Sequence, residues 1–268
     1  MTGIPESIKK ILPPALRRFL GGIYYGWHGN YRSWADARAR FSGYNSEAIL
    51  KKVKDSAMKV KSGEAAYERD SYIFDEVQYS YPLLSALLFV AASGSGRLNI
   101  IDFGGSLGSS YFQNKIFLDK LSEVNWCVVE QPQFVEAGRE SFEDNRLRFF
   151  YNITECTKEK QIDAILFSSV LQYLEKPFEE INKAINEGIK YIIIDRTPFV
   201  SGRERITVQR VNPAIYKASY PCRFFNKSEF IEFMNKSSRM IIEWQAIDKT
   251  NIRSEFCGFI FENNIQKS

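Results

Sequence analysis

The fold is most constrained by a repeated alternation of short apolar runs and helical stretches between residues 98 and 196. The runs are LNIIDF (98–103), NWCVVE (125–130), LRFFY (147–151), IDAILFSS (162–169) and YIIIDR (191–196). Strands that alternate with helices are typical of βα units, in which the strands form one parallel sheet covered by helices on both faces. The sequence therefore predicts an α/β, doubly wound, Rossmann-like sheet.

The end of the chain follows a different pattern. RMIIEWQAI (239–247) and EFCGFIFEN (255–263) are separated by a polar segment with no helical spacing. Two such runs without a helical crossover predict an antiparallel hairpin. Added to the five runs above, this hairpin gives a mostly parallel, seven-stranded sheet.

The chain divides into an N-terminal helical extension or cap, residues 1–95, and a main domain, residues 96–268. In the extension, apolar spacing predicts helices at 46–63 and 81–92. In the main domain, residues 197–226 show little periodicity, and an irregular segment of this length is usually a lid or a binding loop. Residues 4–20 form short basic amphipathic turns, which either pack on the domain or contact an anionic lipid surface.

Charge, cysteine and histidine content exclude several classes of protein. The chain has 36 basic and 32 acidic residues, a net charge of +4 that is too balanced for a dedicated nucleic-acid-binding protein. No apolar run approaches the roughly 18–20 residues of a membrane span. The first residues, MTGIPESIKKILPP, lack the apolar stretch of a signal peptide. We therefore expect a cytoplasmic protein, with peripheral contact at the inner face of the membrane as an alternative. Four cysteines without CxxC spacing and a single histidine predict reduced thiols and no metal site.

The strongest local motif is IIDFGGSLGSSY, in which a strand ends in a glycine-rich turn that opens a helix. In doubly wound sheets this corner binds nucleotide-containing cofactors. Dinucleotide folds use GxGxxG, and their pyrophosphate lies over the helix N-terminus. Here the glycine spacing differs, and Asp102 at the strand end would stand close to that anion. An acidic residue suits a cofactor with a positive centre, such as S-adenosylmethionine.

Glu130 ends the next apolar run, in VVEQ, and supports the same cofactor. A carboxylate at this place can accept hydrogen bonds from both ribose hydroxyls, and hydrogen bonds to charged groups contribute about 1.5–3 kcal/mol each. Asp102, the glycines and Glu130 on consecutive strands are more specific together than either motif alone. The alternative is a tight structural turn followed by a solvated glutamate.

With these motifs in place, the sequence resembles class I S-adenosylmethionine-dependent methyltransferases. More narrowly, it is similar to a family of bacterial methyltransferases found among lipopolysaccharide and capsule biosynthesis genes. The similarity spans about residues 31–225 and includes the blocks YERDS (67–71), DFGGSLGSSYFQN (102–114), VVEQ (128–131), SSVLQYLE (168–175), DRTPF (195–199) and IYKASYP (215–221).

The resemblance implies which residues hold the cofactor, whose product form is S-adenosylhomocysteine. Asp102, Gly104 and Gly108 would contact the methionine part, and Glu130 the ribose. Residues 151–153 would flank the adenine. The full predicted cofactor set is Asp102, Gly104, Gly105, Ser106, Gly108, Glu130, Gln131, Asn152, Ile153 and Ser168. Ser106 departs from the class pattern, in which a third glycine is common.

Arginines after the fifth run suggest an anionic acceptor, because a guanidinium binds phosphate or carboxylate through two parallel hydrogen bonds. A solvated basic loop paired with nearby acids is the alternative. The predicted acceptor-binding residues are Arg196, Arg203, Arg205, Arg210, Tyr216 and Tyr220, with Arg223 in the same basic set. The two tyrosines either wall the acceptor pocket or form the core of the lid.

The predicted function is O-methyl transfer to a sugar, a sugar phosphate or a phosphoryl substituent of a bacterial surface polysaccharide; the polysaccharide setting is implied by the resemblance alone. A sugar hydroxyl needs a base, and the candidates are Tyr173, Asp70 and His28, with Asp195 as a further option. A domain that binds the cofactor or a glycan without turnover, as partner of another enzyme, is the alternative. An NAD(P)-linked oxidoreductase is disfavoured by the glycine spacing.

Overall fold

A parallel sheet lies at the centre of the structure, which is a computed structural model that describes residues 25–40, 46–69, 71–212, 215 and 218–264. Its strands lie side by side in the order β6 (Leu147–Phe150), β5 (Glu123–Val129), β4 (Arg97–Phe103), β7 (Ala164–Ser168) and β8 (Tyr191–Val200). All four neighbouring pairs are parallel. The predicted doubly wound α/β sheet is confirmed.

The C-terminal hairpin is also confirmed. Strand β12 (Glu255–Asn263) pairs antiparallel with β8, and β11 (Ser238–Gln245) pairs antiparallel with β12 at the edge. These seven strands are the ones that the sequence predicts, but the predicted total of seven is too low for the sheet as a whole.

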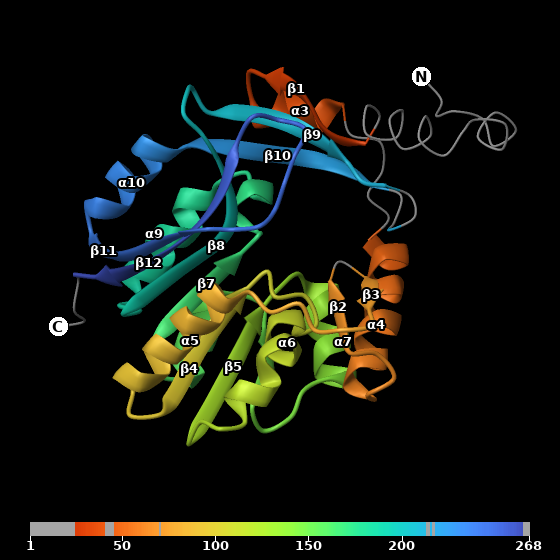
Figure 1. The fold of residues 1–268 in the computed structure, drawn as a ribbon, viewed down its shortest axis with the longest axis vertical. Helices are drawn as coiled ribbons and strands as arrows, with labels where there is room; N and C mark the ends of the chain where they lie inside the picture. The colour runs from red at the N-terminus through yellow and green to blue at the C-terminus, as the bar shows by residue number, and fades with distance from the viewer. Residues whose placement is uncertain (1–24, 41–45, 70, 213–214, 216–217, 265–268) are drawn as a thin grey trace, which may run out of the picture.

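Three further strands extend the sheet, so that it has ten strands in the described part of the chain. Strand β9 (Arg205–Arg210) is antiparallel to β10 (Ser219–Asn226), whose last two residues pair with the end of β8. Strand β1 (Gly26–Tyr31) pairs with the other edge of β9. Most of the segment 197–226, expected to be irregular, therefore forms strands. Figure 1 shows β1, β9 and β10 together above the carboxyl ends of the central strands.

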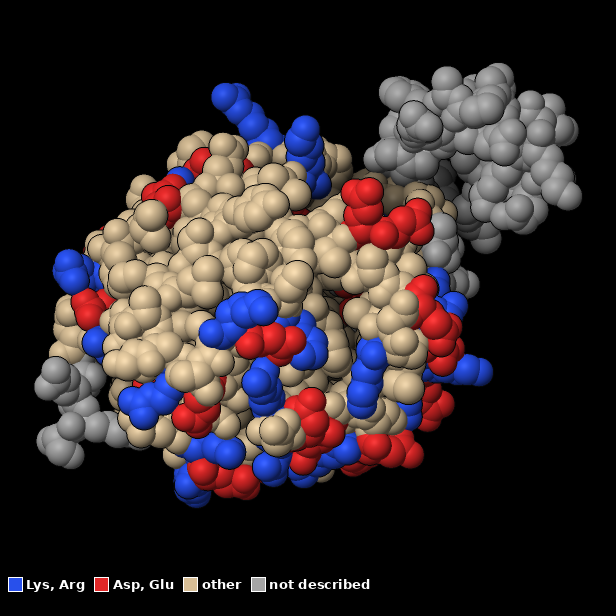
Figure 2. Space-filling view, turned by 60° about the horizontal axis from the view of Figure 1, so that its bottom comes forward, with Lys and Arg blue, Asp and Glu red and all other residues tan. Residues whose placement is uncertain are grey.

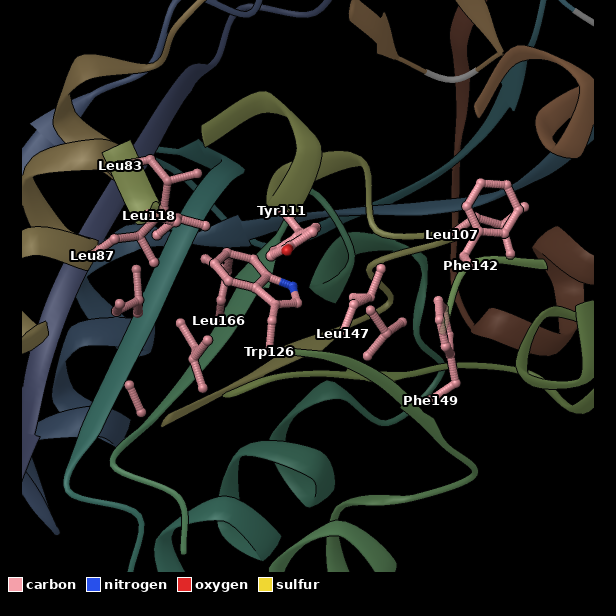
Figure 3. Close-up of a cluster of buried hydrophobic side chains, with 14 of the residues drawn as sticks. Leu83, Leu87, Leu107, Tyr111, Leu118, Trp126, Phe142, Leu147, Phe149 and Leu166 are labelled. Carbon is pink, nitrogen blue, oxygen red and sulfur yellow. The ribbon is translucent and has the colours of Figure 1, made fainter. Parts of the chain in front are cut away.

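Helices cover both faces of the central sheet. On one face, α5 (Tyr81–Ser93), α6 (Ser109–Leu118) and α7 (Pro132–Ser141) enclose a core built around Trp126, Tyr111 and Phe149 (Figure 3). On the other, α8 (Ile153–Glu159), α9 (Pro177–Asn186) and α10 (Lys227–Asn235) enclose a second core that is rich in phenylalanine. Burial on both sides explains why the central strands are almost uniformly apolar.

The N-terminal extension is only partly helical. Helices α4 (Ser46–Lys61) and α5 confirm the two predicted helices, and α3 (Trp34–Ala39) precedes them. Strand β1 belongs to the large sheet, and β2 (Tyr67–Arg69) and β3 (Tyr72–Phe74) form a small hairpin, so the predicted helical extension also contains strands. The hairpin packs against α6 through β2. The predicted amphipathic segment 4–20 lies outside the described residues.

The surface carries charges of both signs. On the face shown in Figure 2, basic and acidic side chains are interspersed and form no patch of one sign. All four cysteines are buried and unpaired. Among the described helices, none has the length and apolar content that a bilayer crossing requires.

A close approach between α7 and β6 gives a test of this packing. A Cβ atom added at Gly138 would lie 2.4 Å from the ring of Phe149, which is almost fully buried. We expect Gly138→Ala to lower the free energy of unfolding by about 1–3 kcal/mol, because overpacking a core forces side chains out of place. Urea denaturation measures the change. Gly202→Ala is the matched control, since no atom lies within 4 Å of its added Cβ, and equal stabilities of the two variants would contradict the packing.

Candidate functional site

A cavity of about 590 Å³ lies where the carboxyl ends of β4, β5, β7 and β8 meet. Its floor includes Asp102, Glu130 and Ser168, each within one residue of the end of its strand, and Asp195 in the middle of β8, which pairs with Ser168. The remaining walls come from α4, the β2–β3 region, β9 and β10, and the connection between β11 and β12. The volume is that of a site for a small molecule or cofactor.

Asp102 lies beneath the glycine turn and is anchored to the core. It is 1% exposed, and the indole N–H of Trp126 donates to its Oδ2 at 3.1 Å. A Cβ at Gly105 would stand 2.5 Å from this carboxylate, so only glycine lets the turn close over it. Burial, reinforced by the charge of Glu130, raises the pKa of Asp102 from 3.8 to about 7.

Glu130 is held at the end of β5 by the backbone. Its Oε2 accepts a hydrogen bond from the N–H of Gln131 at 2.6 Å, and the backbone N–H of Ser106 also donates to the carboxylate. Burial nevertheless raises its pKa. Because a carboxylate has about four acceptor positions, two remain for hydroxyl groups of a ligand.

A second group of polar side chains surrounds Asp195, which lies in β8 beside Ser168 at the end of β7. Asp195 accepts hydrogen bonds from Ser168 Oγ and from Trp244 Nε1, both at 3.1 Å, and burial raises its pKa. The next residue, Arg196, donates to Asp248 from both Nε and Nη2, with a shortest distance of 3.0 Å. Its guanidinium is therefore neutralised by a residue of the β11–β12 connection.

Backbone strain is concentrated at the cavity. In the described residues, five non-glycine residues have φ between 52° and 66°. Four of them, Ser71, Ser106, Ser169 and Arg196, line the cavity, and only Ser95 lies elsewhere. Left-handed backbone at non-glycine residues costs about 1–3 kcal/mol each and gathers at functional sites.

The structure brings many of the predicted residues together. Those that line the cavity are Asp102, Gly104, Gly105, Ser106, Glu130, Gln131, Ser168, Tyr173, Asp195, Arg196 and Tyr220. Tyr173 donates its hydroxyl to Gln209 Oε1 at 2.8 Å and contacts the ring of Tyr220 edge-on. Their roles in binding or catalysis remain predictions.

Other predicted cofactor residues do not line the cavity. Asn152 caps α8 by accepting from the N–H of Glu155, Ile153 is buried in the second core, and Gly108 lies beside Leu147. His28, a candidate base, is on β1, outside the cavity lining. Asp70 and Tyr216 lie outside the described residues.

The expected arginine cluster is not assembled, which is a correction. Of its five described members only Arg196 lines the cavity. Arg205 donates to the carbonyl of Gly29, and Arg223 pairs with Glu204 and donates to the carbonyl of Glu175. Arg203 is exposed on the β8–β9 turn, and Arg210 is exposed at the end of β9. These side chains stabilise or flank the added strands.

Several cavity residues were not predicted from the sequence. They are Glu68, Arg69, Ser71, Phe134, Gln209, Trp244 and Asp248. For Glu68, Arg69 and Ser71 there was a signal, because they belong to the block YERDS, but that block gave no chemical role. For Trp244 and Asp248 there was none, because they follow an ordinary strand pattern. Among the described residues, no group of three or more His, Cys, Asp or Glu could hold a metal ion.

No protein-family model and no curated protein matches the chain. Solved structures with a similar fold include the N-terminal domain of EvdMO1 with SAH and D-fucose, at 13% identity and a TM-score of 0.47, covering 82% of this chain and 97% of that one. A Burkholderia thailandensis 1,6-didemethyltoxoflavin-N1-methyltransferase with S-adenosylhomocysteine is 12% identical, with a TM-score of 0.45, over 84% of this chain and 92% of that one. The magnesium protoporphyrin IX methyltransferase of Synechocystis with bound SAM is 10% identical, with a TM-score of 0.45, over 80% of this chain and 97% of that one. Likeness at this level assigns no reaction and no ligand to this chain.

The raised pKa of Asp102 predicts a pH dependence of stability. Between pH 3.8 and about 7 the folded protein holds a proton that the unfolded chain releases. This stabilisation is complete below pH 3.8 and is lost as the pH rises to 7. We expect the wild type to lose unfolding free energy relative to Asp102→Asn over this range, as urea titrations at successive pH values would show. Asp119→Asn is a control in which the effect has the opposite sign, because Lys115 lowers the pKa of Asp119. If the difference in unfolding free energy between the wild type and Asp102→Asn did not change with pH, the raised pKa of Asp102 would be contradicted.

Proposed function

We propose that the chain is an S-adenosylmethionine-dependent methyltransferase. The observation that supports this most is the pairing of Glu130 with the glycine turn: the backbone N–H of Ser106, within the turn, donates to the Glu130 carboxylate. A ribose held by Glu130 would therefore lie beside the turn that covers Asp102. A sulfonium is favoured in a cavity whose described lining includes five acidic residues, Glu68, Asp102, Glu130, Asp195 and Asp248, against two arginines.

The residues present fit this cofactor chemically. Glu130 offers acceptor positions for the two ribose hydroxyls, and Gln131, just before α7, and Phe134 of α7 extend the wall beyond it. When bound, the cofactor supplies an electrophilic methyl group. The protein has to orient an acceptor against that methyl group and exclude water, and such positioning can contribute about 7–11 kcal/mol at best.

We propose that the acceptor atom is a hydroxyl oxygen. A hydroxyl needs a proton acceptor, and Asp195 is the buried carboxylate on the side of the cavity away from Glu130, beyond β4 and β7 in the sheet. Ser168, which lines the cavity and donates to Asp195, can relay the proton. Tyr173 is a second candidate, but its hydroxyl already donates to Gln209.

The acceptor we propose is a sugar hydroxyl in the synthesis of a bacterial surface polysaccharide. The polysaccharide setting is supported only by the resemblance of the sequence blocks. Within the proposal, an uncharged sugar fits better than a sugar phosphate or phosphoryl substituent, because the one predicted arginine in the cavity is already paired with Asp248. Tyr173, Tyr220 and Gln209 offer aromatic and amide surfaces for such an acceptor.

The cofactor assignment is tested by binding. We expect Glu130→Ala to weaken S-adenosylhomocysteine binding by about 10- to 100-fold, because hydrogen bonds to a charged group are lost. Isothermal titration calorimetry measures the dissociation constant. Glu136→Ala, on the α7 that follows, is an exposed control. An unchanged dissociation constant in Glu130→Ala would show that Glu130 does not bind the cofactor.

The acceptor side is tested by turnover. We expect Asp195→Asn to lower kcat by about 10²- to 10⁴-fold, the usual contribution of a general base, while S-adenosylhomocysteine binding stays within about 2-fold. The assay follows S-adenosylhomocysteine release with uncharged sugars and their phosphates as paired acceptors. Asp163→Asn is the matched control, since Asp163 lies at the opposite end of β7 and hydrogen-bonds Asn99. Full activity in Asp195→Asn would show that Asp195 is not the base. Turnover of the sugar phosphates but not of the uncharged sugars would exclude an uncharged sugar as the acceptor.

A further inference from the structure

Strand β2 places two residues of opposite charge on the cavity wall, outside the doubly wound core. Glu68 is 3% exposed, and the adjacent Arg69 is half-buried; both line the cavity. A buried carboxylate is costly unless it is hydrogen-bonded or paired with a cation. Glu68 accepts hydrogen bonds from Ser109 Oγ and from the backbone N–H of Ser71, the latter at 3.2 Å. Both bonds hold the carboxylate in place on the wall of a cavity that can admit a cation.

The hydrogen bond to Ser109 fixes where Glu68 acts. Ser109 is the first residue of α6 and follows directly on the glycine turn, residues 104–108. Glu68 therefore reaches the end of the turn from the N-terminal extension, whereas Glu130 reaches the turn from β5. The two carboxylates contact the turn at different residues, Ser109 and Ser106.

Ser71 supplies an independent indication of a ligand. Its side chain is 6% exposed and lines the same cavity, and its Oγ has no hydrogen-bond partner among the described residues. Ser71 also adopts a left-handed backbone, with φ of 66°. Buried hydroxyl groups in native proteins are nearly always hydrogen-bonded. A polar ligand group that hydrogen-bonds Ser71 Oγ would explain why this hydroxyl has no partner among the described residues.

We propose that Glu68 and Arg69 bind the amino-acid end of the cofactor, with Glu68 facing the α-ammonium and Arg69 the α-carboxylate. This inference rests on the proposed function. An amino acid is a zwitterion, and a wall with consecutive acidic and basic residues complements both of its charges. Arg69 is oriented by Gln78 Oε1 at 3.0 Å and by the rings of Tyr67 and Phe74, and a guanidinium has five N–H donors to share.

A role of Glu68 in helix capping alone would have different consequences. A carboxylate at a helix N-terminus stabilises the helix whatever ligand is present. A residue that binds the amino-acid group discriminates between ligands with and without that group. S-adenosylhomocysteine has it, whereas 5′-methylthioadenosine keeps the adenine, ribose and thioether but lacks it.

The test compares the binding of these two ligands by calorimetry. We expect Glu68→Gln to weaken S-adenosylhomocysteine by about 10- to 100-fold, the range for interactions with charged groups, and methylthioadenosine by less than about 2-fold. Ser71→Ala removes a hydroxyl without a partner, leaves the fold unchanged, and should weaken only S-adenosylhomocysteine, by about 3- to 10-fold. Glu64→Gln, an exposed glutamate just before β2, is the control and should change neither.

The proposed contact of Arg69 with the α-carboxylate is tested with a third ligand. The aminopropyl analogue of S-adenosylhomocysteine has the amine but no carboxylate, so Arg69→Gln should weaken S-adenosylhomocysteine and leave the analogue unchanged, whereas Glu68→Gln should weaken both. Equal losses for S-adenosylhomocysteine and methylthioadenosine in Glu68→Gln, or no loss for either, would overturn this inference while leaving the proposed function intact. A wild type that binds none of the three ligands would overturn both.

Discussion

The hydrogen bond from Trp126 to Asp102 joins the hydrophobic core to the floor of the cavity. Trp126 is fully buried on β5 beneath α6, and its indole N–H needs an acceptor. The Asp102 carboxylate, closed over by the glycine turn, needs a donor. Each group satisfies the other at 3.1 Å, and leaving either alone would cost about 1–3 kcal/mol. The position of the turn, and of everything that binds to it, therefore depends on the packing of one core side chain.

Parallel topology extends this constraint to the rest of the site. Because β4, β5, β7 and β8 run in the same direction, the polar residues at their ends meet at one edge of the sheet without any long loop. The same edge exposes strand ends that other elements must cover. Strands β9, β10 and β1 cover one side, and the β2–β3 hairpin covers the other. The cavity is thus the space between a regular sheet and the additions that are specific to this chain.

The regular part could be predicted from the sequence and the additions could not. Asp102 and Glu130 end apolar runs, so their place at the sheet edge follows from local pattern. One of the two partners of β9 is β1, residues 26–31, and no local pattern can indicate a pairing across so many residues. For this reason residues 197–226 resembled a loop, and their arginines resembled a binding cluster. In the structure Arg205 instead bonds the carbonyl of Gly29 in β1. Glu68 was not predicted for a similar reason, since its proposed role depends on the packing of β2 against α6.

The corrected position of the arginines also changes the electrostatics expected of the reaction. The described cavity lining is predominantly acidic, and Arg196 is balanced by Asp248. Such a site favours a positive ligand and opposes a phosphorylated one. In the proposed reaction, methyl transfer from a sulfonium to a hydroxyl would leave a neutral thioether, and the proton would pass to a buried carboxylate. The ligand would lose its positive charge as the site lost a negative one, so the charge balance inside the cavity would be kept. A phosphoryl acceptor would need no base and would leave Asp195 charged and buried, with Arg196, already paired with Asp248, as the nearest cation that the described residues offer.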